Sequence, residues 1–192
     1  MRTLFLQAPS FDGFDGGAGS RYQARREIRS FWYPTWLAQP AALVEGSKLV
    51  DAPPHGTKLA AVTASARDYD LVVLHTSAPS FASDVATIKA LKEANSALKI
   101  GLVGAKVAVD PAGSLNASPL IDFAARNEFD FTIKEIADGR SWPTSPDCPI
   151  AIRRASSCTT TSAPSWKAWT ACRSSRRSTS ATSKSRITLS AT

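Results

Sequence analysis

The sequence predicts a doubly wound α/β fold, in which five parallel strands form a sheet with helices on both of its faces. Short apolar runs alternate with helix-period segments through residues 1–140, which is the pattern of strands that are each followed by a helix. The apolar runs are continuous, as is typical of strands buried on both faces. With 192 residues, the chain is long enough for one domain with a substantial core.

The first two strands are predicted at Thr3–Gln7 and Lys48–Asp51. A connection of about 25 residues, rich in glycine, aspartate and aromatic residues, follows the first strand. It exceeds the usual length of such loops, so we expect it to be functional or mobile. A helix is predicted from Leu37 to Glu45, with Pro40 in the first turn, where a missing N–H is tolerated.

The middle of the chain supplies two further predicted helices and the central strand. Leu59, Val62 and Ala66 are spaced for one helix, and the run 71–74 is suited to a buried strand. The next helix is predicted to bury Val85, Ile88 and Leu91 and to pair Lys89 with Glu93 on its outer face.

The last two strands are predicted at Ile100–Val103 and Ile121–Ala125, and a closing helix follows through Phe129, Ile133 and Ile136 to Gly139. Right-handed crossovers make the predicted sheet doubly wound and flavodoxin-like. In such sheets a ligand binds at the carboxyl ends of the strands.

Small, hydroxyl-bearing and charged residues follow four of the predicted strands, and we predict that they line one cofactor-binding edge. Backbone N–H groups and small side chains at such an edge allow a bulky ligand to approach closely. For each of these residues taken singly, a purely structural role is as well supported as a role in ligand binding. The predicted residues are Pro9, Ser10, His75, Thr76, Ser77, Gly104, Ala105, Lys106, Asn127 and Glu128.

His75 suggests a metal ligand or a catalytic base, but no second histidine or cysteine is spaced to share a metal with it. A strand-end histidine held by hydrogen bonds is the favoured interpretation. The glycines between Gly13 and Gly19 form neither GxGxxG nor a phosphate loop. Three scattered cysteines, Cys148, Cys158 and Cys172, indicate unpaired thiols rather than a zinc site or disulfides. We therefore predict no metal site and no catalytic residue.

The composition changes at Trp142, which divides the chain into a predicted domain, residues 1–142, and a tail, residues 143–192. The tail holds eight Lys and Arg against the single acid Asp147, which accounts for the net charge of +7, and it has none of the ten glycines. It is rich in serine and threonine without apolar periodicity, so we expect residues beyond about 145 to be disordered or only locally helical.

Two explanations of the tail remain open. A basic tail with Trp166 and Trp169 is compatible with binding to nucleic acid or to a membrane surface. Alternatively, one base is lost after the Trp142 codon: restoring it in a permitted back-translation of residues 142–151 gives WADIPGLSYR. We favour the lost base, and therefore predict no nucleic-acid partner.

Five segments carry a resemblance: TLFLQAPSFDGFDGG, FWYPTWLAQPAALVEGSKLVDAPP, DYDLVVLHTSAPSFASDV, KIGLVGAKVAV and IDFAARNEFDFTIKEIADG. Together they resemble the N-terminal cobalamin-binding domain of B12-dependent radical S-adenosylmethionine enzymes associated with hopanoid biosynthesis. The resemblance covers residues 1–142. It implies a flavodoxin-like fold with a corrinoid at the strand ends, and a radical domain as the partner of that fold in the full protein.

The resemblance also implies roles for particular residues. Thr76 and Ser77 match the family's hydroxyl-rich turn, Gly104 and Ala105 its small pair, and Asn127-Glu128 its Gly-Glu. The DxHxxG motif, which supplies a histidine to cobalt in other B12 domains, is absent, so a His-off mode is implied.

The cluster motif of the family is also absent. The sequence has no CxxxCxxC, so the [4Fe–4S] cluster and S-adenosylmethionine belong to the full-length family and not to this chain, which we expect to be inactive alone. The alternative is a flavodoxin-like phosphate-binding or protein-binding module without corrinoid. No signal peptide and no membrane-spanning run are evident, so we expect a cytoplasmic location.

Overall fold

The computed structural model describes residues 1–11, 33–139, 150–154 and 157–159. Within them, a parallel sheet is built from β1 (Thr3–Gln7), β2 (Lys48–Asp51), β3 (Leu71–His75), β4 (Lys99–Val103) and β5 (Phe123–Ala125). The strand order is β2-β1-β3-β4-β5, and each neighbouring pair among these five is parallel. This order is the flavodoxin-like one, so the predicted fold class is confirmed.

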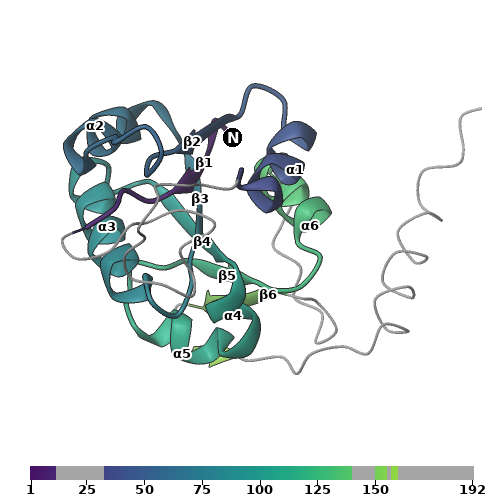
Figure 1. Cartoon of the computed structure of the whole chain (residues 1–192). Coiled ribbons are helices and arrows are strands. Elements are labelled where there is room, and N and C mark those ends of the chain that lie inside the picture. Colours follow the sequence, from purple (N-terminus) through teal and green to yellow (C-terminus); the bar gives the residue numbers. More distant parts are fainter. Residues whose placement is uncertain (12–32, 140–149, 155–156, 160–192) are drawn as a thin grey trace, which may run out of the picture.

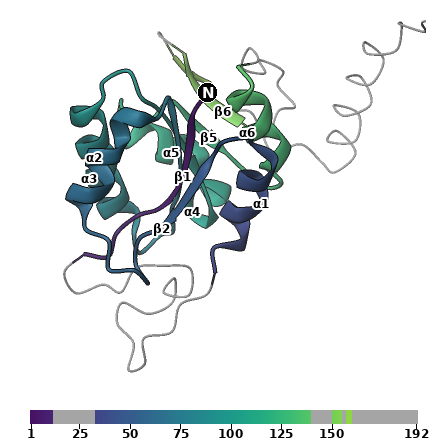
Figure 2. The same ribbon diagram turned by 90° about the horizontal axis from the view of Figure 1, so that it is seen from above.

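Helices cover both faces of the sheet, as Figures 1 and 2 show. α1 (Thr35–Leu43) and α6 (Asp130–Ala137) lie together on one face. The other face carries α2 (Leu59–Ser65), α3 (Phe81–Ala94), α4 (Ala105–Val109) and α5 (Pro111–Asn116), with a short 3-10 turn, η2 (Ala66–Asp68), after α2. The two helices between β4 and β5 were not predicted individually.

Alternate residues of each strand enter two separate cores. Leu4, Leu6, Val72 and Leu74 pack under α2 and α3. Phe5, Val73 and Phe123 pack under α1 and α6 in the second core. The continuous apolar runs of the sequence therefore arise because both faces of the strands are buried.

Two further strands extend the sheet beyond β5. β6 (Ile150–Arg154) pairs antiparallel with β5, and β7 (Ser157–Thr159) pairs antiparallel with β6. The prediction that the tail contributes no strand is wrong for these residues, because β5 leaves an open edge whose backbone groups β6 satisfies, and Ile150 enters the second core. The rest of the predicted tail lies outside the described residues, as does most of the long loop after β1.

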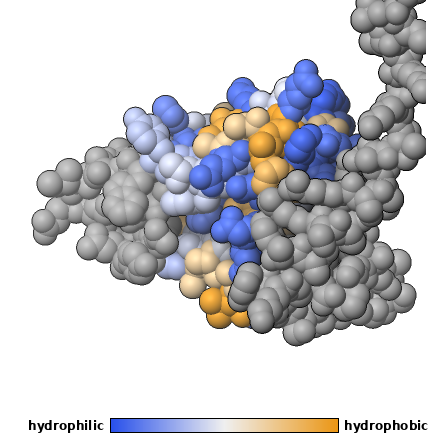
Figure 3. All heavy atoms as spheres, turned by 90° about the vertical axis from the view of Figure 1, so that its right-hand side faces the viewer, coloured by the Kyte–Doolittle hydropathy of each residue, from blue (hydrophilic) through white to orange (hydrophobic). Residues whose placement is uncertain are grey.

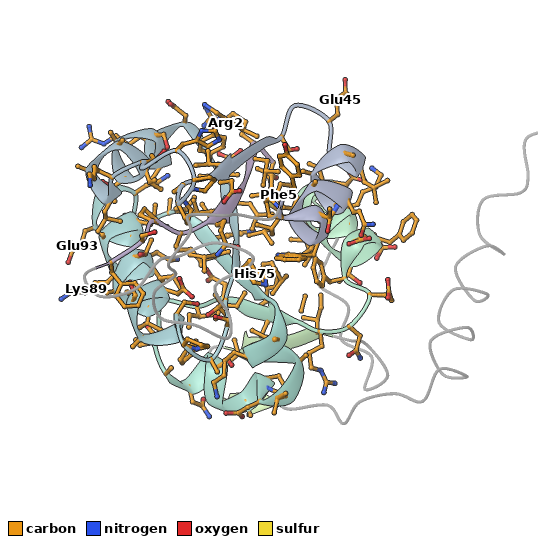
Figure 4. The ribbon with its side chains drawn as sticks, viewed as in Figure 1. Arg2, Phe5, Glu45, His75, Lys89 and Glu93 are labelled. Carbon is orange, nitrogen blue, oxygen red and sulfur yellow. The ribbon has the colours of Figure 1, made fainter. Side chains whose placement is uncertain are left out.

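Details of two helices differ from the prediction. α1 begins at Thr35, earlier than expected, so Pro40 lies inside the helix rather than in its first turn. α3 buries Asp84 and Thr87 with Ile88 and Leu91, whereas Val85 is only partly buried. The predicted pair of Lys89 and Glu93 is present at 4.0 Å, and both side chains point away from the domain in Figure 4.

The face formed by α1 and α6 has a mixed surface. Figure 3 shows hydrophobic residues lying among hydrophilic ones on this side of the molecule. Phe131 of α6 is a large hydrophobic side chain that remains 54% exposed. No helix in the described part of the chain is long and apolar enough to span a bilayer.

Candidate functional site at the carboxyl edge of the sheet

The predicted site residues follow the carboxyl ends of four parallel strands. Pro9 and Ser10 follow β1, and Asn127 and Glu128 follow β5. Between them, His75 is the last residue of β3 and the other five residues follow β3 or β4. Three strand spacings separate β1 from β5, so the line of residues is roughly 14 Å long. Ser10, Ala105, Asn127 and Glu128 are exposed along it.

The fold brings the β3 and β4 ends into direct contact. Gly104 has φ +112°, and a Cβ placed on it would lie 2.4 Å from the carbonyl oxygen of Thr76 and 2.9 Å from Nε2 of His75. Only glycine satisfies both the backbone conformation and the approach. The ring of His75 also packs against Trp36 of α1, with 5.1 Å between ring centroids. The imidazole of His75 is therefore packed between Trp36 and Gly104.

The turn after β3 is a closed network of hydroxyl groups around one buried acid. Thr76 donates its hydroxyl to Oδ2 of Asp84 at 2.6 Å, and Ser80 donates to the same oxygen at 2.7 Å. Ser77 contacts the Ser80 hydroxyl through its own hydroxyl at 2.9 Å and donates its backbone N–H to it at 3.1 Å. The hydroxyl of Thr76, which is fully buried, is therefore already engaged within the protein.

Asp84 is the strongly perturbed acid of this edge. It is 3% exposed, and burial raises its pKa to about 7, against the opposing effect of the hydrogen bonds from Thr76 and Ser80. Asp84 was not among the site residues predicted from the sequence. Its spacing of four and seven residues from Ile88 and Leu91 was a usable signal, because that spacing puts Asp84 on the buried face of the helix.

A second group of polar residues lies on the opposite face of the same edge. In register across neighbouring strands, Asp51 of β2 is beside Gln7 of β1, and Gln7 is beside His75 of β3. These residues have the same strand parity as Phe5 and Val73, so their side chains point to the face that α1 covers. Oε1 of Gln7 and Oδ1 of Asp51 are buried and have no hydrogen-bond partner within the described part of the chain.

Sequence reasoning did not single out Gln7 or Asp51, although both were recognised as the last residues of strands. Alternation along each strand was the available signal, because a polar residue two positions after Phe5 or Leu49, both of which pack into the second core, must share that face. Only the register of three separate strands shows that Asp51, Gln7 and His75 are adjacent.

The remaining predicted residues make local contacts. Lys106 forms an ion pair with Asp110 at 2.9 Å and lies 5.4 Å from the centre of the Phe81 ring. This pair holds the pKa of the Asp110 carboxyl below its usual value through the hydrogen bond from Lys106 and the backbone N–H of Gly113. Asn127 adopts φ 56° in the turn to α6, a conformation that asparagine tolerates better than most residues.

The described residues contain no group of three His, Cys, Asp or Glu side chains placed to hold a metal ion. Neither a protein-family model nor a curated protein matches the chain.

Proposed function

We propose that residues 1–142 form the corrinoid-binding domain of a B12-dependent radical S-adenosylmethionine enzyme of hopanoid biosynthesis, and that cobalamin lies across the carboxyl edge of the sheet. The observation that carries the proposal is the length of that edge. Predicted residues on four adjacent strand ends span roughly 14 Å, which suits a large flat ligand better than a single phosphate group.

Two features of the edge fit a corrinoid. The ring of cobalamin carries peripheral carboxamides, and their N–H groups are donors of the kind that the buried Oε1 of Gln7 lacks among the described residues. Ala105 is a small, exposed residue at the start of α4, where a bulky ligand could approach the backbone. Ser10, Ser77, Lys106 and Asn127 would supply polar contacts around the ligand's rim.

The cofactor would supply organometallic chemistry at cobalt, while this chain would bind and orient it. His75 is fixed by Trp36 and Gly104, and the sequence lacks DxHxxG, so we propose a His-off mode. Because the 192-residue sequence has no CxxxCxxC, the reaction with S-adenosylmethionine would require a separate radical domain.

Reconstitution tests the proposal directly. The full chain, mixed with hydroxocobalamin and desalted, should retain a corrinoid absorption spectrum. Ala105→Trp should abolish retention, because the indole would occupy the ligand's volume. Ala97→Trp is the matched control, since Ala97 is also exposed but lies before β4 at the opposite edge. A colourless wild-type protein would instead support a flavodoxin-like phosphate-binding or protein-binding module.

The origin of the tail is a separate proposal. We propose that one base is lost after the Trp142 codon, because charge, glycine content and cysteine content all change at that point. The pairing of β6 with β5 is the observation that weighs against it. Resequencing the gene should reveal a longer frame with CxxxCxxC downstream, and its absence would restore the native basic tail as a candidate nucleic-acid or membrane contact.

A further inference from the structure

A cavity of about 430 Å³ opens beside the carboxyl end of β2. Most of its wall is apolar and includes Pro34, Leu49 and Pro54, whereas Asp51 and His55 bring polar groups to it. The β2 strand is the edge of the sheet, since its strand neighbour is β1 alone. The cavity therefore lies at one end of the line of strand ends, beyond β1, and is separate from the β3 and β4 ends.

Asp51 brings to this cavity a carboxylate with one buried oxygen that lacks a hydrogen-bond partner among the described residues. Its side chain is half-buried, and Oδ1 has no donor among the described residues. Burial raises the pKa of this carboxyl, and the nearby charge of His55 acts in the opposite direction. A cationic donor bound in the cavity beside this half-buried carboxylate would offset part of the cost of its burial.

The chemistry of the cavity selects among ligand classes. A carboxylate accepts hydrogen bonds and repels anions, so a phosphate or carboxylate ligand is disfavoured. A metal ion would need more ligands than the described residues place together. A positively charged donor complements the Asp51 carboxylate at the cavity wall, and a primary ammonium is a compact donor that needs only one carboxylate oxygen.

We propose that this cavity binds a small primary amine, with Asp51 accepting from the ammonium group and the apolar wall, including Leu49 and Pro54, enclosing the carbon skeleton. Such a site is distinct from the corrinoid edge, and it does not depend on cobalamin being present.

Binding of benzylamine to the full chain tests the proposal, with benzyl alcohol as the neutral analogue of the same shape. We expect saturable backbone amide shifts in residues 49–57 at about pH 8, well above the usual titration of a carboxyl group. The alcohol should bind at least tenfold more weakly. Equal affinity for the two compounds, or no binding of benzylamine, would overturn the proposal.

A pair of variants tests whether Asp51 is the carboxylate that binds the amine. Asp51→Asn should weaken benzylamine binding at least tenfold, whereas Asp68→Asn should leave it unchanged, because Asp68 is exposed on η2 and away from the cavity. Unchanged binding by Asp51→Asn would contradict the proposal. The comparison of amine and alcohol on the wild-type chain decides the question even where a variant fails to fold, and corrinoid retention is read separately from its absorption spectrum.

Discussion

The turn after β3 and the ends of β1 and β2 lie at the same edge of the sheet but differ in how their polar groups are satisfied. In the turn, Asp84 receives hydroxyl hydrogen bonds from Thr76 and Ser80. At the ends of β1 and β2, buried oxygens of Gln7 and Asp51 have no partner among the described residues. The polar groups of the turn are satisfied by other groups of the protein. The oxygens at the ends of β1 and β2 are not satisfied within the described part of the chain, so that region is better suited to accept hydrogen bonds from a ligand.

This difference weakens the prediction that the hydroxyl groups after β3 contact a ligand directly. A hydroxyl-rich turn at a strand end suggested direct ligand contacts, yet the hydroxyls of Thr76 and Ser80 are used to stabilise a buried acid. Ligand contacts near β3 would therefore come from backbone groups rather than from the Thr76 side chain. Four predictions test whether the two regions differ as described.

The largest effect is expected from the pH dependence of Asp84. Because its folded-state pKa is raised from 3.8 to about 7, the folded protein binds more protons than the unfolded chain between these values. The neutral acid therefore contributes to the free energy of unfolding below pH 3.8, and this contribution is lost as the pH rises to about 7. The loss amounts to at most roughly 4 kcal/mol.

Urea unfolding of the full chain at several pH values measures this loss. Asp84→Asn should remove that part of the slope, because the amide can still accept from Thr76 and Ser80 but does not ionise. Asp68→Asn, at an exposed position, is the control for a change of charge. Identical pH profiles for wild type and Asp84→Asn would show that the acid does not titrate in this range.

The second largest change in stability is expected from the contact between the ends of β3 and β4. Gly104→Ala should destabilise the domain by about 3 kcal/mol, because the added Cβ meets the Thr76 carbonyl and the backbone conformation is strained for any other residue. Gly46→Ala is the matched control, since Gly46 also has positive φ but nothing lies within 4 Å of its added Cβ. We expect it to cost about 1 kcal/mol. Equal costs in thermal unfolding would contradict the close contact.

A direct comparison of the two regions comes from removing one polar group from each. Thr76→Val should destabilise by about 2 kcal/mol, because it deprives a buried carboxylate of a donor. Gln7→Leu should change stability by less than about 1 kcal/mol in the absence of ligand, since it removes a buried acceptor that is unpaired among the described residues. Chemical denaturation of both variants shows which of them loses more stability. A larger loss of stability for Gln7→Leu than for Thr76→Val would contradict the difference between the two regions.

The smallest effect is expected for Asp51. Burial raises its folded-state pKa, so the ionised carboxylate opposes folding at pH values above that raised pKa, and the penalty disappears in acid. Asp51→Asn should therefore stabilise the ligand-free chain by roughly 0.5 kcal/mol near pH 8 and by nothing near pH 3. A thermal shift series across pH is the measurement. Destabilisation near pH 8 would indicate that Asp51 has a favourable partner.

Much of the fold was accessible from local sequence patterns. Continuous apolar runs and helix-period spacing predicted the five parallel strands, because a strand buried on both faces needs apolar residues at every position. They did not predict β6, since Ile150–Arg154 has little periodicity of its own and forms a strand by pairing with the open edge of β5. Likewise, α4 and α5 are too short to produce a clear periodic signal.

For the candidate site, the sequence by itself determined that small and polar residues follow the strands, because each lies next to an apolar run that can be recognised locally. Tertiary structure alone decided which of them meet. The hydroxyls of Thr76 and Ser80 find Asp84 through the packing of α3, and Gln7 and Asp51 become neighbours through the register of β1 with β2. Hydrogen-bond satisfaction depends on distances between segments far apart in the chain, and the order and register of strands set those distances.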